Sequence, residues 1–148
     1  MSLKARVNED MKAALRGGDK LRLGTIRMLM AAVKQREVDD RREMSDAEVL
    51  QIVEKLIKQR RESAVQFASG GRTDLEAKEL AEARILADYL PAQLDEAEIR
   101  ALLDEAIRAT GAAGMKDMSK VMSALRPKVQ GRADMSEISN LVKARLAG

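Results

Sequence analysis

Apolar residues recur at spacings of three and four along almost the whole chain, and this periodicity is typical of amphipathic α-helices. In the first segment, for example, Leu3, Val7, Met11 and Leu15 fall on one stripe. No segment shows the sustained alternation of apolar and polar residues that a half-buried β-strand requires. The pattern therefore predicts an all-α protein with seven helices.

Glycine, proline and capping residues divide this pattern into separate helices. The expected helices occupy about residues 3–16, 20–39, 45–69, 73–90, 95–111, 118–129 and 134–146. Ser45 with Glu48, and Thr73 with Glu76, have the spacing of a capping box at a helix N-terminus. Pro127 lies inside the sixth expected helix, so a kink or an early end is predicted there.

The clearest break in the chain follows Leu90, where an apolar helix end meets Pro91. A proline at this position stops the helix and stiffens the connection that follows it. We therefore expect two domains, an N-terminal four-helix lobe over residues 1–92 and a C-terminal three-helix bundle over residues 93–148. A lobe of about 55 residues can fold alone, but its stability is marginal.

The composition of the 148 residues narrows the possible chemistry. The chain has neither cysteine nor histidine, which removes thiol nucleophiles, histidine bases and the usual zinc sites. We assign no catalytic residue, no metal and no cofactor. The longest fully apolar run, Met28 to Val33, is far shorter than a membrane span, so a soluble cytoplasmic protein is expected.

Three charged residues fall on faces that are otherwise apolar. Arg60 lies in the middle of the apolar face of the third helix, and Glu79 and Glu82 lie on that of the fourth. A tight turn at Gly70 and Gly71 would make these helices antiparallel and bring Arg60 within reach of both carboxylates. Because an unpaired buried guanidinium is costly, we expect an ion pair that fixes the helix register. A charged active-site cluster is the alternative.

The C-terminal third of the chain is basic, with nine lysines and arginines against five acidic residues from position 99 onward. Such cations can hold phosphates, and the near absence of aromatic residues favours recognition of a folded RNA by shape and backbone. A generic basic surface explains the charge equally well. Met118 and Met122, with Met115 before them, are more typical of a core than of a soft partner-binding groove.

Several motifs follow one another in an order and spacing that together are quite specific. They are Lys58–Ser63, Gly71–Leu75, the pair Glu79 and Glu82, Tyr89–Pro91, Lys116–Met122 and Gly131–Asp134. Over essentially the whole chain, the sequence resembles the GatB/YqeY family, and specifically its stand-alone YqeY-like proteins. The resemblance implies two helical lobes, of which the C-terminal one is similar to the tail domain of the B subunit of the tRNA-dependent amidotransferase.

In the family, the tail helps to hold tRNA, while the amidation chemistry belongs to other parts of the complex. The resemblance therefore implies tRNA as a partner, with amidotransferase subunits or another translation protein as further partners. The implied tRNA-facing groups lie at or beside the C-terminal motif and are Lys116, Lys120, Lys128 and Arg132. Ser119 and Ser123 stand where the family often has glycine, a residue that allows close approach of the backbone.

The function expected from these observations is a tRNA-binding or amidotransferase-associated module without a catalytic centre of its own. Family members are often assigned carbon–nitrogen ligase activity with glutamine as amido-N-donor. However, the sequence lacks an activated cysteine and the glycine- and serine-rich amidase signature with its catalytic lysine. Two other functions stay open, an adaptor that docks a partner protein through the methionine-lined sixth helix and a genuine amide-transfer enzyme.

Overall fold

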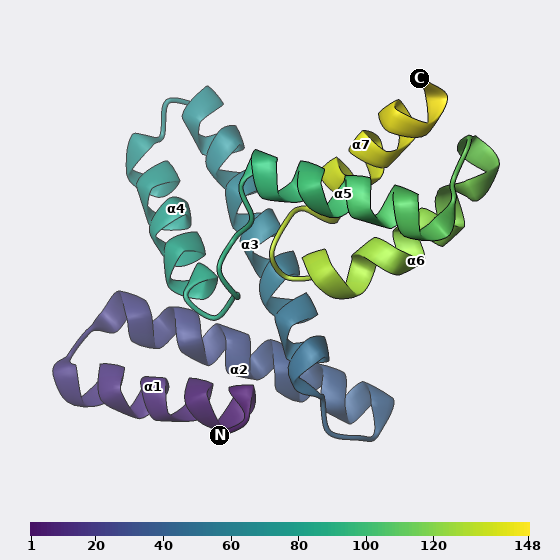
Figure 1. Ribbon diagram of the computed structural model, residues 1–148. Coiled ribbons are helices and arrows are strands. Elements are labelled where there is room, and N and C mark those ends of the chain that lie inside the picture. Colours follow the sequence, from purple (N-terminus) through teal and green to yellow (C-terminus); the bar gives the residue numbers. More distant parts are fainter. The chain divides into compact units, whose positions relative to one another are not determined.

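The computed structural model describes residues 1–148, and the chain forms seven α-helices, one short 3-10 helix and no β-strand (Figure 1). The predicted all-α class and the predicted number of helices are confirmed. The elements are α1 Leu3–Gly17, α2 Lys20–Asp40, α3 Asp46–Ser69, α4 Thr73–Ala87, α5 Glu96–Thr110, the 3-10 helix η1 Met115–Asp117, α6 Met118–Val129 and α7 Met135–Ala147.

The backbone divides into two compact units, Met1–Leu90 and Pro91–Gly148. The first unit contains α1 to α4, and the second contains α5, η1, α6 and α7. Each unit has a hydrophobic core of its own. The predicted domain boundary after residue 92 lies in the segment between α4 and α5, and the assignment of two domains stays a prediction.

In the first unit, α1 and α2 form one helical hairpin and α3 and α4 form another (Figure 1). The core of this unit includes Leu29 of α2, Val53 of α3 and Leu86 of α4, and none of these side chains is exposed. Just after α4, the buried Tyr89 donates a hydrogen bond of 2.7 Å to Asp10 of α1. This bond fastens the end of α4 to α1.

In the second unit, α5, α6 and α7 pack around a smaller core. Leu103 of α5, Leu125 of α6 and Ile138 of α7 are almost completely buried there. Gly111 follows α5 in the left-handed conformation, with φ of 65°, which glycine adopts without the steric cost that other residues bear.

Two local predictions have different outcomes at the helix N-termini. The capping box of α3 is confirmed, because the Ser45 hydroxyl accepts from the Glu48 N–H and the Glu48 carboxylate accepts from the Ser45 N–H. The box proposed for Thr73 and Glu76 is wrong. Thr73 is already the first residue of α4, and Arg72 occupies the cap position without a side-chain cap bond.

Pro127 does not end its helix at once, because α6 continues to Val129. The proline therefore lies in the last turn, where the helix ends within two residues of it. The N–H of Gln130 still donates to the Arg126 carbonyl at 3.0 Å. The missing N–H of proline consequently costs one hydrogen bond close to the natural end of the helix.

Candidate functional site

The four cations expected to face tRNA lie in one stretch of the second unit. Lys116 is in η1, Lys120 and Lys128 are in α6, and Arg132 is in the loop before α7. The three lysines are exposed, whereas Arg132 is half-buried. On a helix with about 100° per residue, Lys120 and Lys128 are about 80° apart and therefore lie on the same side of α6.

The two lysines of α6 have acidic neighbours within the second unit. Lys120 Nζ lies 4.0 Å from an Asp117 carboxylate oxygen, and Lys128 Nζ lies 3.2 Å from Glu105 Oε1 of α5. The Lys120 side chain is 70% exposed and that of Lys128 is 46% exposed. Exposed pairs of this kind contribute only about 0–1 kcal/mol, so phosphate oxygens can replace these carboxylates.

Arg132 has a different environment, because its guanidinium already has a backbone partner. Its Nε donates to the Ala92 carbonyl at 3.1 Å, and its own carbonyl accepts from the Leu94 N–H at 2.8 Å. These two bonds hold the segment that leads into α5 against the loop that leads into α7. Arg132 would have to release Ala92 before its Nε could bind a phosphate.

Some cations of the second unit have no carboxylate oxygen within 4.0 Å, unlike Arg100 and Arg145, which pair with Glu96 and Asp104. They include Lys116 of η1, Arg126 of α6 and Lys143 of α7, and all three are exposed. These side chains are free to bind an anion without losing an ion pair. Of these three residues, the family resemblance implied only Lys116 as a tRNA-facing group. Arg126 and Lys143 were counted among the basic residues of the C-terminal third but were not named as site residues.

Asp117 orders the loop from which Lys116 projects. Its carboxylate accepts from the Ala113 N–H at 2.9 Å, and its own N–H donates to the Gly114 carbonyl at 2.9 Å. The bond from Ala113 is the main reason that the pKa of Asp117 is lowered, with help from Lys120 and Lys116. The aspartate therefore stays ionised at neutral pH and fixes the loop between α5 and α6.

The methionines near α6 divide into two kinds. Met118 and Met122 are half-buried and pack against the core of the second unit. Met115, in contrast, is 46% exposed. Most of the methionine stripe therefore belongs to the core, and Met115 is the member that is accessible to a partner.

In the first unit, the structure brings Arg60 of α3 to Glu82 of α4. Arg60 Nε lies 3.4 Å from Glu82 Oε2, and the two side chains are only 14% and 16% exposed. The guanidinium also contacts the sulfur of Met28 on α2. Glu79 has no lysine or arginine nitrogen within 4.0 Å, so it does not share this ion pair. The structural role of the pair stays a prediction.

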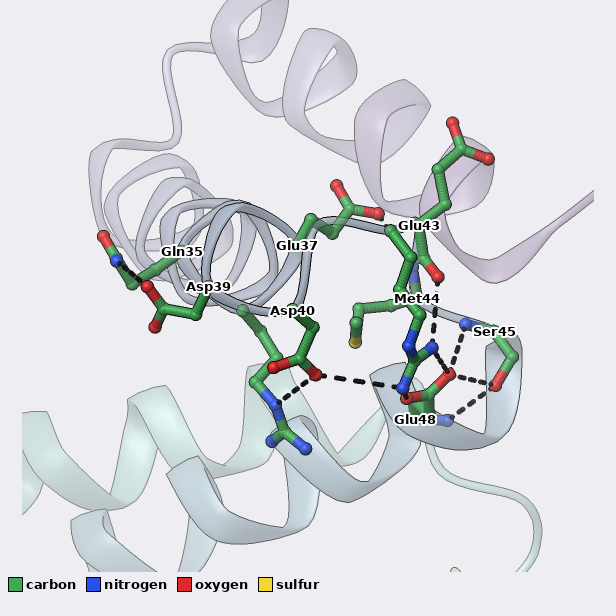
Figure 2. Close-up of polar contacts among 10 residues, drawn as sticks. Gln35, Glu37, Asp39, Asp40, Glu43, Met44, Ser45 and Glu48 are labelled. Atoms are coloured by element: carbon green, nitrogen blue, oxygen red, sulfur yellow. Dashed lines mark hydrogen bonds and ion pairs between the residues drawn. The ribbon is translucent and has the colours of Figure 1, made fainter.

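A second polar cluster, at the corner between α2 and α3, was not predicted from the sequence (Figure 2). Glu37 Oε2 accepts from the Met44 N–H at 2.9 Å and from Lys4 Nζ of α1 at 2.6 Å. The Lys4 ammonium is the larger cause of the lowered pKa of Glu37, and the Met44 N–H is the next. The glutamate is thereby ionised and held in one position.

Close to Glu37 in the same corner, Arg42 binds Glu48 through two nitrogens at 2.8 Å and 2.6 Å. This bidentate bond is the main cause that lowers the pKa of Glu48 to about 2, and the Ser45 N–H lowers it further. Figure 2 shows Ser45 and Glu48 bonded to each other where the chain turns into α3. The turn that carries Met44 toward Glu37 is thus fixed by hydrogen bonds on both sides.

A cavity of about 470 Å³ lies beside Glu37 in the first unit. Its apolar wall includes Val7 of α1, Met30 and Val33 of α2, and Val49 of α3. Its polar wall consists of Lys4, Lys34 and Glu37. Periodicity could not reveal this cavity, because its residues come from three helices and the contact of Lys4 with Glu37 spans 33 positions.

Comparison with known proteins identifies a family model that covers almost the whole chain and individual relatives that match parts of it. The family model described as Yqey-like protein matches residues 4–146. The protein named altered inheritance of mitochondria protein 41, mitochondrial, of Eremothecium gossypii is 38% identical over 89 residues, which are 60% of this chain and 49% of that protein. The protein of the same name from Lachancea thermotolerans is 32% identical over 124 residues, 78% of this chain and 66% of the relative.

The matched part of this chain spans about half the length of the first of these curated relatives. The Kluyveromyces lactis protein of the same name, for instance, is 37% identical over 57% of this chain and 46% of its own length. Among the helices of this chain, none combines the length and the apolar character that a membrane span needs.

Proposed function

Because this chain belongs to the YqeY-like protein family, we propose that it is a tRNA-binding module associated with tRNA-dependent amidation. In this proposal the chain has no catalytic centre of its own. One observation carries the proposal: η1 and α6 present exposed lysines that are unpaired or only weakly paired. Lys116 has no carboxylate within 4.0 Å, and Lys120 is 70% exposed beside a carboxylate 4.0 Å away. Such lysines can neutralise phosphates without breaking a strong ion pair.

The four candidate groups would contribute unequally to tRNA binding. Lys116 and Lys120 would bind phosphates first, and Lys128 would exchange Glu105 for a phosphate oxygen. Arg132 would contribute least, because its Nε already donates to Ala92. Recognition would depend on the shape and backbone of a folded RNA, since the whole chain has only one tyrosine and one phenylalanine to stack on bases.

In this proposal the module holds tRNA, and the partners that carry out the amidation are amidotransferase subunits or another translation protein. Any carbon–nitrogen ligase activity with glutamine as amido-N-donor would then belong to the complex. Glutamine-dependent release of ammonia by the purified chain alone would instead establish an amide-transfer enzyme. A protein adaptor is the second alternative, and the exposure of Met115 is the observation that favours it.

The test is the binding of unmodified tRNA at a series of salt concentrations. Replacing Lys116 and Lys120 together by alanine is expected to weaken binding and to reduce the slope of log K against log salt by about two, one for each lost phosphate contact. The matched control replaces Lys12 and Lys78, two exposed lysines of the first unit, and should leave the slope unchanged. Absence of saturable binding at low salt, or equal slopes for both double variants, would refute the proposal.

The compartment is part of the same proposal, because the module must meet its tRNA. The cytoplasm is the predicted location, whereas the fungal relatives carry the word mitochondrial in their names. Fractionation of the source cells, with the tagged chain followed alongside cytoplasmic and organellar markers, distinguishes the two. Recovery in a compartment that contains no tRNA would contradict the proposed function.

A further inference from the structure

The cavity beside Glu37 has the form of a small-ligand site. Its volume of about 470 Å³ falls within the range of about 300–1,000 Å³ that is typical of such sites. Val7, Val33 and Val49 line it and are nevertheless only 4%, 6% and 0% exposed. The cavity therefore reaches down to side chains that belong to the core of the first unit.

The charges at this cavity are not balanced. The Lys4 ammonium is bound to Glu37 at 2.6 Å, and the carboxylate of Glu43 also raises the pKa of Lys4. Glu37 in turn has two donors on one oxygen, the Lys4 ammonium and the Met44 N–H. Lys34 lies at the same cavity and is exposed. Its charge helps to lower the pKa of Glu37, but it forms no ion pair within 4.0 Å. Two ammonium groups and one carboxylate therefore line the cavity, and the net charge of its lining is positive.

We propose that this cavity binds a small amphipathic acid, with the apolar tail against Val7, Val33 and Val49 and the carboxylate beside Lys34. The apolar wall provides burial for a hydrocarbon chain, and Lys34, which makes no direct ion pair, can bind the carboxylate of the ligand. Lys4 can add a second donor, because an ammonium has three N–H groups and one of them is used by Glu37.

Charge complementarity decides between an acid and other apolar ligands. An amine would be repelled by Lys34 and would have to compete with Lys4 and Met44 for the carboxylate of Glu37. A neutral alcohol would fill the apolar part but would add no negative charge beside the two lysines, which share the single carboxylate of Glu37. This inference concerns the first unit alone and does not depend on tRNA binding by the cations of the second unit.

The test uses the full chain labelled with ¹³C at the methionine methyl groups, and three ligands with the same tail. Decanoate, decanol and decylamine are titrated below the concentrations at which they aggregate. Decanoate is expected to shift the Met30 methyl signal saturably, because Met30 lines the cavity. The methyl groups of Met118 and Met122, in the core of the second unit, serve as internal controls and should stay in place. Decanol is expected to bind about tenfold more weakly than decanoate, since it lacks the charge-assisted contact.

Two variants make the test specific to this cavity. Lys34→Gln should weaken decanoate about tenfold and leave decanol unchanged, whereas the control Lys58→Gln, on the exposed face of α3, should change neither. Ala31→Leu places a larger side chain at an exposed position that lines the cavity, and it should abolish the Met30 shift. The matched control Ala13→Leu, at an exposed position of α1 outside the cavity, should leave the Met30 shift intact. An unmoved Met30 signal, equal binding of the three ligands, or unchanged binding to Lys34→Gln would overturn the proposal.

Discussion

Glu48 shows how one side chain fixes a turn of the backbone. It occupies the third position of α3, where it closes the capping box with Ser45 and also receives two hydrogen bonds from Arg42. A carboxylate near a helix N-terminus is further favoured by the helix dipole. Because the anion is stabilised from several directions, the pKa of Glu48 falls from its usual 4.5 to about 2.

This lowered pKa predicts a pH-dependent contribution to stability. A carboxyl group whose pKa is lower in the folded state than in the unfolded state contributes fully to the stability of the protein at pH values above its unfolded-state pKa. This contribution is lost as the pH falls toward the folded-state pKa. Glu48→Gln keeps the capping geometry but removes the charge, so it should be less stable than the wild type at pH 7. The difference should shrink between about pH 4.5 and pH 2.

Denaturant unfolding followed by circular dichroism across this pH range measures the effect of Glu48→Gln. The matched control is Glu62→Gln, an exposed position of α3 with no lysine or arginine nitrogen within 4.0 Å of its carboxylate. The control should show little difference from the wild type at any pH. A stability loss in Glu48→Gln that is independent of pH would contradict the assignment of the charge to this turn.

The hairpin of α3 and α4 depends on two features that act at the scale of whole helices. Gly71 turns the chain between them with φ of 74°, in the region that favours glycine. The pair of Arg60 and Glu82 then joins the two helices at a position where both side chains are largely buried. Burial makes this pair sensitive to the loss of either member, because the remaining charge has no equivalent partner.

We therefore predict that Arg60→Met and Glu82→Gln each destabilise the protein by about 1–3 kcal/mol. The double variant should lose less than the sum of the two, with a coupling of about 1 kcal/mol or more. Urea unfolding of the four proteins in the cycle gives these values. Glu79→Gln is the control on the same helix, because Glu79 is not part of the ion pair. If the coupling is near zero and neither single variant is destabilised, the pair does not fix the register.

The helices were predictable because their signals are local, whereas the cavity was not. Periodic apolar positions, the cap at Ser45 and the glycine after α5 each act within a few residues, and each predicted the element that forms. The proximity of Arg60 and Glu82 followed from one added assumption, a tight turn. Lys4 and Glu37, in contrast, meet only because α1 packs beside the end of α2, and no local pattern encodes that contact.

At the scale of the whole molecule, the chain contains two hydrophobic cores that share no residue. Leu86 belongs to the first and Leu125 to the second, and both side chains are almost completely buried. A unit of about 60 residues, such as the second, buries only about 60% of the surface that its unfolded chain exposes. Its stability should therefore be the lower of the two.

If the two units are separate domains, a cavity in one core should destabilise that unit alone. Leu86→Ala and Leu125→Ala are each expected to cost about 2–5 kcal/mol in the unit that contains them. Hydrogen exchange resolved by residue measures this, because amide protection in a core reports the opening of its own cooperative unit. Leu86→Ala should lower protection in α1 to α4 and leave α5 to α7 unchanged, and Leu125→Ala should do the reverse. A substitution that lowers protection equally in all seven helices would show one cooperative unit and refute the two-domain assignment.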